Sequence, residues 1–157
     1  MKIILLCVGA MHDAPLATLV ERYSKRINFY MPAEIMALPD IKASKNLSTE
    51  QQCIKEGEII LSKISTSDYV VLFDELGKEM TSREFSQFIE KKASTLSRNL
   101  IFVIGGPFGF SKAVYDRADY KIALSKMTFT HEMARVLASE QLYRALSILN
   151  GSSYHHD

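Results

Sequence analysis

The chain shows a regular exchange between short apolar runs and helical stripes. Lys2–Val8, Tyr69–Phe73 and Leu100–Ile104 are aliphatic or aromatic with almost no polar interruption, which is typical of strands covered on both faces. Two further runs, Glu34–Leu38 and Tyr120–Leu124, predict strands of similar length. After each run the periodicity changes to that of a helix, so strand and helix alternate along the chain.

Most of the predicted helices begin at a recognisable cap. The start signals are Asp13 with Pro15, the capping boxes Ser48 with Gln51 and Thr81 with Glu84, and Ser111. The last helix runs from about Thr130 to Leu149, and the polar segment Asp40–Asn46 is the best candidate for a loop. This alternation predicts an α/β fold with a largely parallel sheet and helices on both faces, built as a single domain over residues 1–157.

The predicted last helix has apolar side chains around most of its circumference. They are Met133, Val136, Leu137, Leu142, Tyr143, Leu146, Ile148 and Leu149. Such a helix is usually covered on two sides, so we expect a second subunit. A helix sandwiched between other elements of one chain is the alternative interpretation.

Composition and charge narrow the possible partners. The chain is 47% apolar and carries 19 Lys and Arg against 18 Asp and Glu, which argues against a protein that coats nucleic acids or membranes without specificity. Cys7 and Cys53 match no metal-ligand spacing, and we expect a reducing, cytoplasmic environment. The apolar start Ile3–Val8 is too short for a secretion signal, and no stretch approaches the about 20 apolar residues of a membrane span.

Parallel sheets bind ligands beyond the carboxyl ends of their strands, so the loops there carry the candidate chemistry. After Ile104, three glycines, Gly105, Gly106 and Gly109, precede Ser111, and such a loop lets the backbone approach a ligand closely. The spacing fits neither the P-loop nor the dinucleotide-binding motif, which disfavours kinase and conventional dinucleotide sites. A glycine turn that only joins strand to helix is an equally good interpretation.

The loop Leu124–Phe129 mixes apolar and hydroxyl side chains, as pockets for flat heterocycles do, although an ordinary connection also explains it. His131 and Arg135 share one face at the start of the last helix, where the helix end and Arg135 attract phosphate. A structural hydrogen-bonding histidine is the commoner case. Glu140 and Arg144 have the spacing of a helical ion pair with no further role.

Other catalytic signatures are missing from the sequence. His155 and His156 have no third ligand nearby in the sequence, so we expect no metal site. Neither the nucleophile elbow G-x-S-x-G nor the zinc motif H-E-x-x-H occurs, so hydrolase and zinc-protease interpretations have no support.

Six segments, taken in order, carry a joint signature. They are Lys2–Gly9, Phe73–Lys78, Ile104–Gly109, Leu124–His131, Arg135–Arg144 and Tyr154–His155. Together they make the chain similar, over its whole length, to the bacterial ribosomal RNA large subunit methyltransferase H family. The resemblance is far more specific than any one motif.

This resemblance implies a SPOUT-class methyltransferase, with an α/β fold, a C-terminal trefoil knot, a homodimer and S-adenosylmethionine as methyl donor. It implies methylation of N3 of the pseudouridine at position 1915 of 23S ribosomal RNA in the assembled ribosome. The implied cofactor residues are Phe73, Gly105, Leu124, Ser125, Lys126, Met127, Thr128 and Phe129. The implied catalytic residues are His131, Arg135 and His155, and the implied RNA-binding residues are Arg144 and Tyr154.

The resemblance leaves the catalytic base open between two histidines, and the chain differs from the family pattern at two positions. Histidine is the commonest general base near neutral pH, so either His131 or His155 is a candidate for taking the N3 proton. Phe73 stands where the family has leucine, and Thr130 stands where it usually has proline, which we expect to loosen the entry to the last helix.

Two other functions are compatible with parts of the pattern. One is a non-catalytic α/β module that binds a nucleotide at Gly105–Gly109, and binding of S-adenosylmethionine in place of ATP or GTP would exclude it. The other is a related methyltransferase acting on transfer RNA. Those enzymes generally carry an additional RNA-binding domain, and this chain of 157 residues has no room for one.

Overall fold

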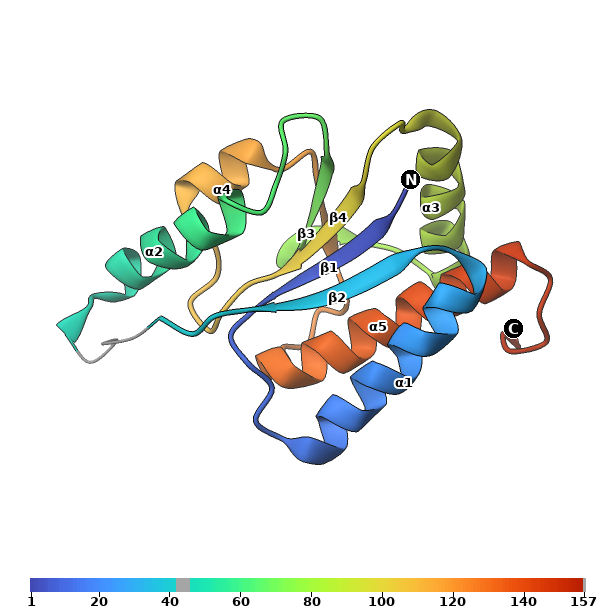
Figure 1. Cartoon of the computed structure of the whole chain (residues 1–157), viewed down its shortest axis with the longest axis horizontal. Helices are drawn as coiled ribbons and strands as arrows, with labels where there is room; N and C mark the ends of the chain where they lie inside the picture. The colour runs from blue at the N-terminus through green and yellow to red at the C-terminus, as the bar shows by residue number, and fades with distance from the viewer. Residues whose placement is uncertain (42–45, 157) are drawn as a thin grey trace.

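A five-stranded sheet forms the centre of the computed structural model, which describes residues 1–41 and 46–156 (Figure 1). The strands are β1 (Ile3–Val8), β2 (Ala33–Leu38), β3 (Tyr69–Glu79), β4 (Leu100–Ile104) and β5 (Tyr120–Ala123). The helices are α1 (Ala14–Tyr30), α2 (Thr49–Leu61), α3 (Ser82–Thr95), α4 (Lys112–Arg117) and α5 (His131–Leu149). The predicted α/β alternation is therefore confirmed.

The strands lie in the order β2-β1-β4-β3-β5, and every neighbouring pair is parallel. In the three central strands, Ile3 is paired with Leu100, and Leu100 is paired with Tyr69. Because all strands point the same way, their carboxyl ends meet at one edge of the sheet, where parallel sheets bind ligands.

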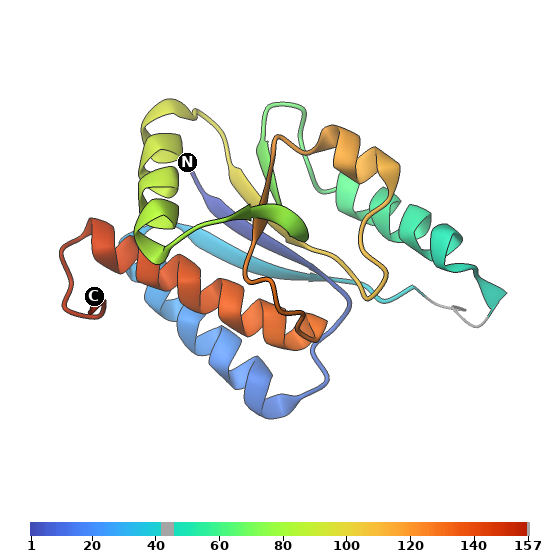
Figure 2. The same ribbon diagram turned by 180° about the vertical axis from the view of Figure 1, so that it is seen from behind.

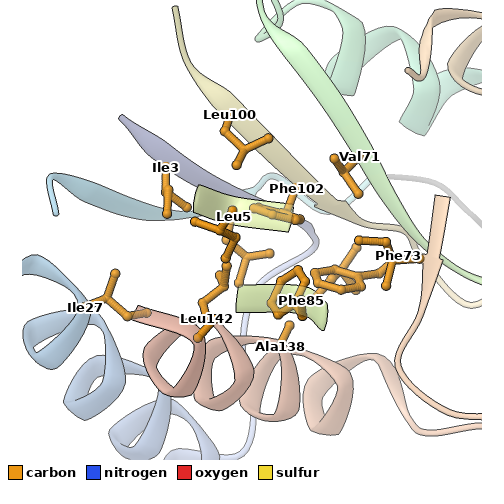
Figure 3. Packing of buried hydrophobic residues seen from close by; sticks show 14 of the residues in the cluster. Ile3, Leu5, Ile27, Val71, Phe73, Phe85, Leu100, Phe102, Ala138 and Leu142 are labelled. Atoms are coloured by element: carbon orange, nitrogen blue, oxygen red, sulfur yellow. The ribbon is translucent and has the colours of Figure 1, made fainter. Parts of the chain in front are cut away.

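Helices cover both faces of the sheet, as the two opposite views show (Figures 1 and 2). Helices α1, α3 and α5 lie on one face, where alternate strand residues such as Leu5 and Phe102 meet Leu142 of α5 (Figure 3). On the other face, Ile60 of α2 and Val114 of α4 pack on the remaining strand residues. The strands are apolar on both sides because each side is buried, which explains their unbroken apolar sequence.

Three aromatic rings pack together in the core on the face that α1, α3 and α5 cover (Figure 3). Phe73 stacks on Phe102 with ring centroids 5.5 Å apart, and the edge of Phe85 meets Phe102 at 5.7 Å. Phe102 has no exposed surface, whereas Phe73 lies at the end of the core and also borders a cavity. The family departure at position 73 thus belongs to this aromatic cluster.

Helix α5 is covered in large part within the chain, as the alternative interpretation of its apolar circumference expected, but Met133 is 36% exposed. It packs against α1 and α3 as well as the sheet, and it lies between these two helices (Figure 2). Ser86 of α3 donates a hydrogen bond to the carbonyl of Ala145 at 2.9 Å, and Tyr143 meets Tyr23 of α1 at 6.0 Å. Contacts within the chain therefore bury most of the apolar side chains of α5, and the second subunit stays a prediction.

The predicted helix starts are confirmed, and two strand ends differ from prediction. Ser48 and Thr81 cap their helices within complete capping boxes. Strand β3 continues to Glu79, although the apolar run stops at Phe73, and β5 ends at Ala123, one residue earlier than predicted. Within the predicted loop 40–46, residues 42–45 lie outside the described residues.

Candidate functional site

A cavity of about 490 Å³ opens at the carboxyl edge of the sheet. It lies among the ends of β3, β4 and β5, the start of α5 and one side of α4. Its lining residues are Phe73–Leu76, Ile104–Phe110, Tyr115, Leu124, Ser125, Met127–Phe129, His131 and Ala134. This volume falls within the range of small-molecule sites.

The β4 loop forms one wall of the cavity. Gly109 has φ of 80°, a left-handed conformation that favours glycine, and its N–H donates to the carbonyl of Gly106 at 3.2 Å. The Sγ of Cys53 on α2 lies 3.4 Å from the carbonyl oxygen of Phe108. The three-glycine segment is therefore a compact turn fastened to α2, with its backbone facing the cavity.

The β5 loop forms the opposite wall and leads directly into α5. The hydroxyl oxygen of Ser125 accepts the N–H of Met127 at 3.0 Å, which closes a tight turn. Thr130 caps α5 by accepting the N–H of Met133, and its φ of −59° is the value that a proline would fix. The threonine thus supplies a cap and has the backbone angle that a proline would fix, and the looser helix entry stays a prediction.

Residues 74–77 of β3 bulge out of the sheet and form the third wall of the cavity; we call this segment the β3 excursion. Phe73 and Lys78 both pair with Ile122 of β5, so residues 74–77 lie outside the ladder. The excursion returns at Gly77, where an added Cβ would lie 2.6 Å from the backbone N and C of Ile122. Only glycine lets the backbone pass so close to β5, and sequence periodicity could not reveal this contact.

Acidic groups dominate the charge of the cavity lining. Asp74 and Glu75 contribute carboxylates, and His131 contributes an imidazole. No lysine or arginine occurs among the lining residues that the structure describes. The lining favours a ligand with positive charge and disfavours a nucleotide phosphate, which proteins usually bind with cationic side chains.

Glu132 fastens the start of α5 to the loop after β1. Its carboxylate accepts the N–H of His12 at 2.5 Å and the N–H of Asp13 at 3.1 Å. These backbone hydrogen bonds, that of Asp13 first, lower the pKa of Glu132. The neighbouring His131 is thereby held at the cavity by a helix end that is fixed by the Thr130 cap and by the hydrogen bonds of Glu132.

Buried Glu56 supports the β4 loop from below. Its side chain accepts a hydrogen bond from Gln52 at 3.1 Å, and an added Cβ on Gly106 would lie 2.7 Å from its Oε2. Burial raises the pKa of Glu56. Its Oε2 has no hydrogen-bond partner among the described residues.

Arg135 does not reach the cavity. Its side chain is 1% exposed, and its Nη2 donates to the carbonyl oxygens of Val8 at 2.5 Å and Gly9 at 2.6 Å. The guanidinium therefore joins α5 to the end of β1. The structure therefore places Arg135 away from the cavity, because helical spacing gave its face but not what covers that face.

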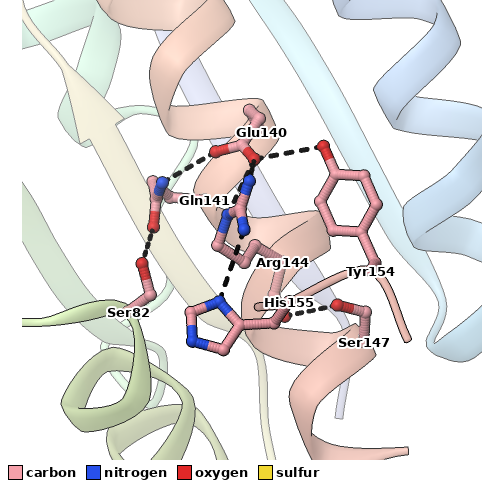
Figure 4. Close-up of polar contacts among 7 residues, drawn as sticks. All are labelled: Ser82, Glu140, Gln141, Arg144, Ser147, Tyr154 and His155. Atoms are coloured by element: carbon pink, nitrogen blue, oxygen red, sulfur yellow. Dashed lines mark hydrogen bonds and ion pairs between the residues drawn. The ribbon is translucent and has the colours of Figure 1, made fainter. Parts of the chain in front are cut away.

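Three of the remaining predicted residues, Arg144, Tyr154 and His155, form a second cluster near the C-terminal end of α5 (Figure 4). Arg144 donates to Glu140 through Nε at 2.9 Å and Nη2 at 2.6 Å, and its Nη1 lies 3.3 Å from Nδ1 of His155. The hydroxyl of Tyr154 donates to the same Glu140 oxygen at 3.2 Å, and burial raises its pKa. The predicted ion pair is thus present, and it organises the C-terminal segment on α5.

Two separate groups therefore result from the predicted site residues. Seven of the eight expected cofactor residues line the cavity together with His131, and these seven are Phe73, Gly105, Leu124, Ser125, Met127, Thr128 and Phe129. Lys126 points elsewhere, with its Nζ 3.8 Å from Glu79. His131 and Arg144 are thirteen residues apart on one helix, which corresponds to about 20 Å at the helical rise.

A pocket walled by strand-end loops of a parallel sheet defines a ligand-binding α/β protein. The family model described as predicted SPOUT methyltransferase matches residues 1–155. A ribosomal RNA large subunit methyltransferase H of Christiangramia forsetii is 51% identical over 156 residues, 99% of each chain. One of the same name from Parabacteroides distasonis is 50% identical over 157 residues, 100% of each chain. The chain therefore belongs to the SPOUT methyltransferase family.

A solved structure shares the fold at low sequence identity. A probable methyltransferase from Bordetella pertussis Tohama I aligns with a TM-score of 0.54 and 13% identity, over 92% of this chain and 95% of that chain.

No helix in residues 1–41 and 46–156 has the length and apolar character to cross a membrane. Within the same residues, no three His, Cys, Asp or Glu side chains gather as metal ligands.

Proposed function

We propose that this chain transfers the methyl group of S-adenosylmethionine to N3 of pseudouridine 1915 in 23S ribosomal RNA, within the assembled ribosome. The observation that carries the proposal is the convergence of three distant loops on one cavity, in a chain about half identical to two ribosomal RNA large subunit methyltransferases H over its full length. The proposal includes a cytoplasmic homodimer and a C-terminal trefoil knot.

The cavity residues suit the chemistry of the cofactor. Phe73, Leu124 and Phe129 offer apolar surface for a flat adenine ring, and the Gly105 backbone allows close approach. The carboxylates of Asp74 and Glu75 suit a positively charged ligand. When bound, S-adenosylmethionine supplies an electrophilic methyl group on a positively charged sulfur.

The protein contributes mainly positioning and exclusion of water. A methyl group on sulfur needs in-line approach by a nucleophilic nitrogen, and fixed loops achieve this by holding the reactants in place. The proton on N3 must leave, and His131 at the cavity and His155 in the second cluster are the two candidates for accepting it. Arg135 acts as a positioning residue through Val8 and Gly9, rather than as a catalytic residue.

A homodimer unites the two clusters. His131 and the Arg144–His155 cluster lie at opposite ends of α5 in one chain, too far apart to contact one nucleotide together. A second copy whose C-terminal segment reaches the first copy's cavity completes the site.

Mixed dimers test the shared site. If His131→Ala and Arg144→Ala are each inactive, an equal mixture after subunit exchange is expected to recover about a quarter of the wild-type activity, because half of the dimers have one intact site of two. A mixture that stays inactive, despite exchange measured by mass spectrometry, would place the whole site within one chain.

Methyl transfer to ribosomal particles tests the function itself. With labelled S-adenosylmethionine, we expect incorporation into 70S ribosomes and weak binding to an isolated 23S hairpin, because a net charge of +1 supports few phosphate contacts. Mass spectrometry of 23S fragments from a strain lacking the protein should show the loss of one methyl group at position 1915. An unchanged mass there would refute the substrate.

Single histidine variants identify the base. Loss of the group that accepts the N3 proton is expected to lower kcat about 100-fold or more, with His156→Ala as the neighbouring control for the C-terminal segment. Full activity of both His131→Ala and His155→Ala would eliminate a histidine base.

A further inference from the structure

Asp74 is held from two sides in the wall of the cavity. Its Oδ1 accepts the N–H of Leu76 at 2.8 Å, and its Oδ2 accepts a hydrogen bond from the hydroxyl of Tyr115. Leu76 belongs to the same β3 excursion, whereas Tyr115 lies on α4 and also lines the cavity. The second hydrogen bond therefore ties the β3 excursion to α4.

Tyr115 is itself fixed by its neighbours. The edge of its ring meets Phe110 of the β4 loop, with centroids 5.7 Å apart and planes at 83°. Lys121 of β5 places its Nζ 5.6 Å from the ring centroid. Burial, and then the hydrogen bond to Asp74, raise the pKa of Tyr115, so its hydroxyl remains a donor at neutral pH.

This arrangement gives Asp74 a fixed orientation that Glu75 does not share. Both carboxylates line the cavity, but no hydrogen bond or ion pair of Glu75 is found among those of the described residues. A carboxylate held by two donors loses less freedom when it faces a cation, so its charge acts at a defined place. The cavity has no lysine or arginine among its described lining residues to offset that charge.

We propose that Asp74, positioned by Tyr115, recognises the positive charge of the cofactor and so distinguishes it from the demethylated product. S-adenosylmethionine carries a charged sulfonium, whereas S-adenosylhomocysteine lacks the methyl group on sulfur and carries a neutral thioether in its place. A fixed negative charge favours the first and gives the second no such gain, so product leaves more readily. This inference rests on the proposed function, because it assumes that the cavity takes this cofactor.

Titration calorimetry with both ligands tests the proposal on the purified full chain. We expect Asp74→Asn to weaken binding of S-adenosylmethionine by on the order of tenfold, and to change the affinity for S-adenosylhomocysteine by less than about threefold. Tyr115→Phe keeps the ring and removes only the hydroxyl, and it should shift the ratio of the two affinities in the same direction by a smaller factor. The ratio is the readout, because a purely structural role weakens both ligands alike.

Asp116→Asn is the matched control. Asp116 lies next to Tyr115 on α4, is exposed, pairs with Lys112 at 2.5 Å and does not line the cavity. The same chemical change there should leave the affinity ratio unchanged. Circular dichroism of each variant reports whether the fold is retained.

The outcomes separate the two proposals. An unchanged ratio in both Asp74→Asn and Tyr115→Phe, with wild type binding both ligands, overturns the charge recognition and leaves the proposed function intact. Wild-type protein that binds neither ligand overturns the cofactor assignment itself. If both variants have a lower ratio of S-adenosylmethionine affinity to S-adenosylhomocysteine affinity, and Asp116→Asn matches wild type, the charge recognition is supported.

Discussion

Replacing Gly77 by alanine tests how closely the β3 excursion depends on its contact with β5. The added Cβ would lie 2.6 Å from the backbone N and C of Ile122 and 2.8 Å from the N of Ala123. These are backbone atoms, which cannot rotate away as a side-chain end can. Overpacking of this kind costs about 2–3 kcal/mol, and in a chain of this size the loss corresponds to about 4–12 °C in Tm.

The assay is urea unfolding at fixed protein concentration, followed by titration with S-adenosylmethionine. Because β5 leads into the loop Leu124–Phe129, a displaced β5 should also lower the affinity for S-adenosylmethionine. Gly151→Ala is the control: Gly151 has φ of 67° and no atom within 4 Å of an added Cβ, so it should lose about 1–2 kcal/mol of stability from backbone strain alone. Gly77→Ala within about 0.5 kcal/mol of wild type would refute the reasoning.

Three further substitutions follow from burial and from the pKa shifts. Phe102→Ala removes a ring with no exposed surface and should cost about 3–5 kcal/mol in denaturant unfolding; a loss under about 1 kcal/mol would contradict the packing. Glu132→Gln should lower Tm at pH 6 and match wild type well below pH 4.5, because a carboxylate with a lowered pKa stabilises the fold only at pH values where it is ionised. A difference in Tm that persists in acid would argue against this. Glu56→Gln should gain Tm over wild type as pH rises above 4.5, because burial raises the pKa of Glu56 and its ionisation costs stability; a constant difference would count against this.

Much of the fold was predictable because its signals are local. Unbroken apolar runs, capping boxes and a three-glycine turn each depend on residues close together in sequence, and the structure has strands, caps and a turn at those places. The position of the ligand pocket followed from parallel strand direction, since all carboxyl ends meet at one edge. The loops after Ile104 and Leu124 were candidates for the same reason, and the family resemblance added which of their residues would meet the cofactor.

Local sequence patterns specify which segments become strands and helices, since propensity, capping and hydrophobic period act over a few residues. The tertiary structure decided the strand order, the four-residue excursion that carries Asp74, and the separation of the predicted site residues into two clusters. It also decided that Arg135 is enclosed beside Val8 and Gly9. These features depend on contacts between residues far apart in the chain, which no local pattern encodes.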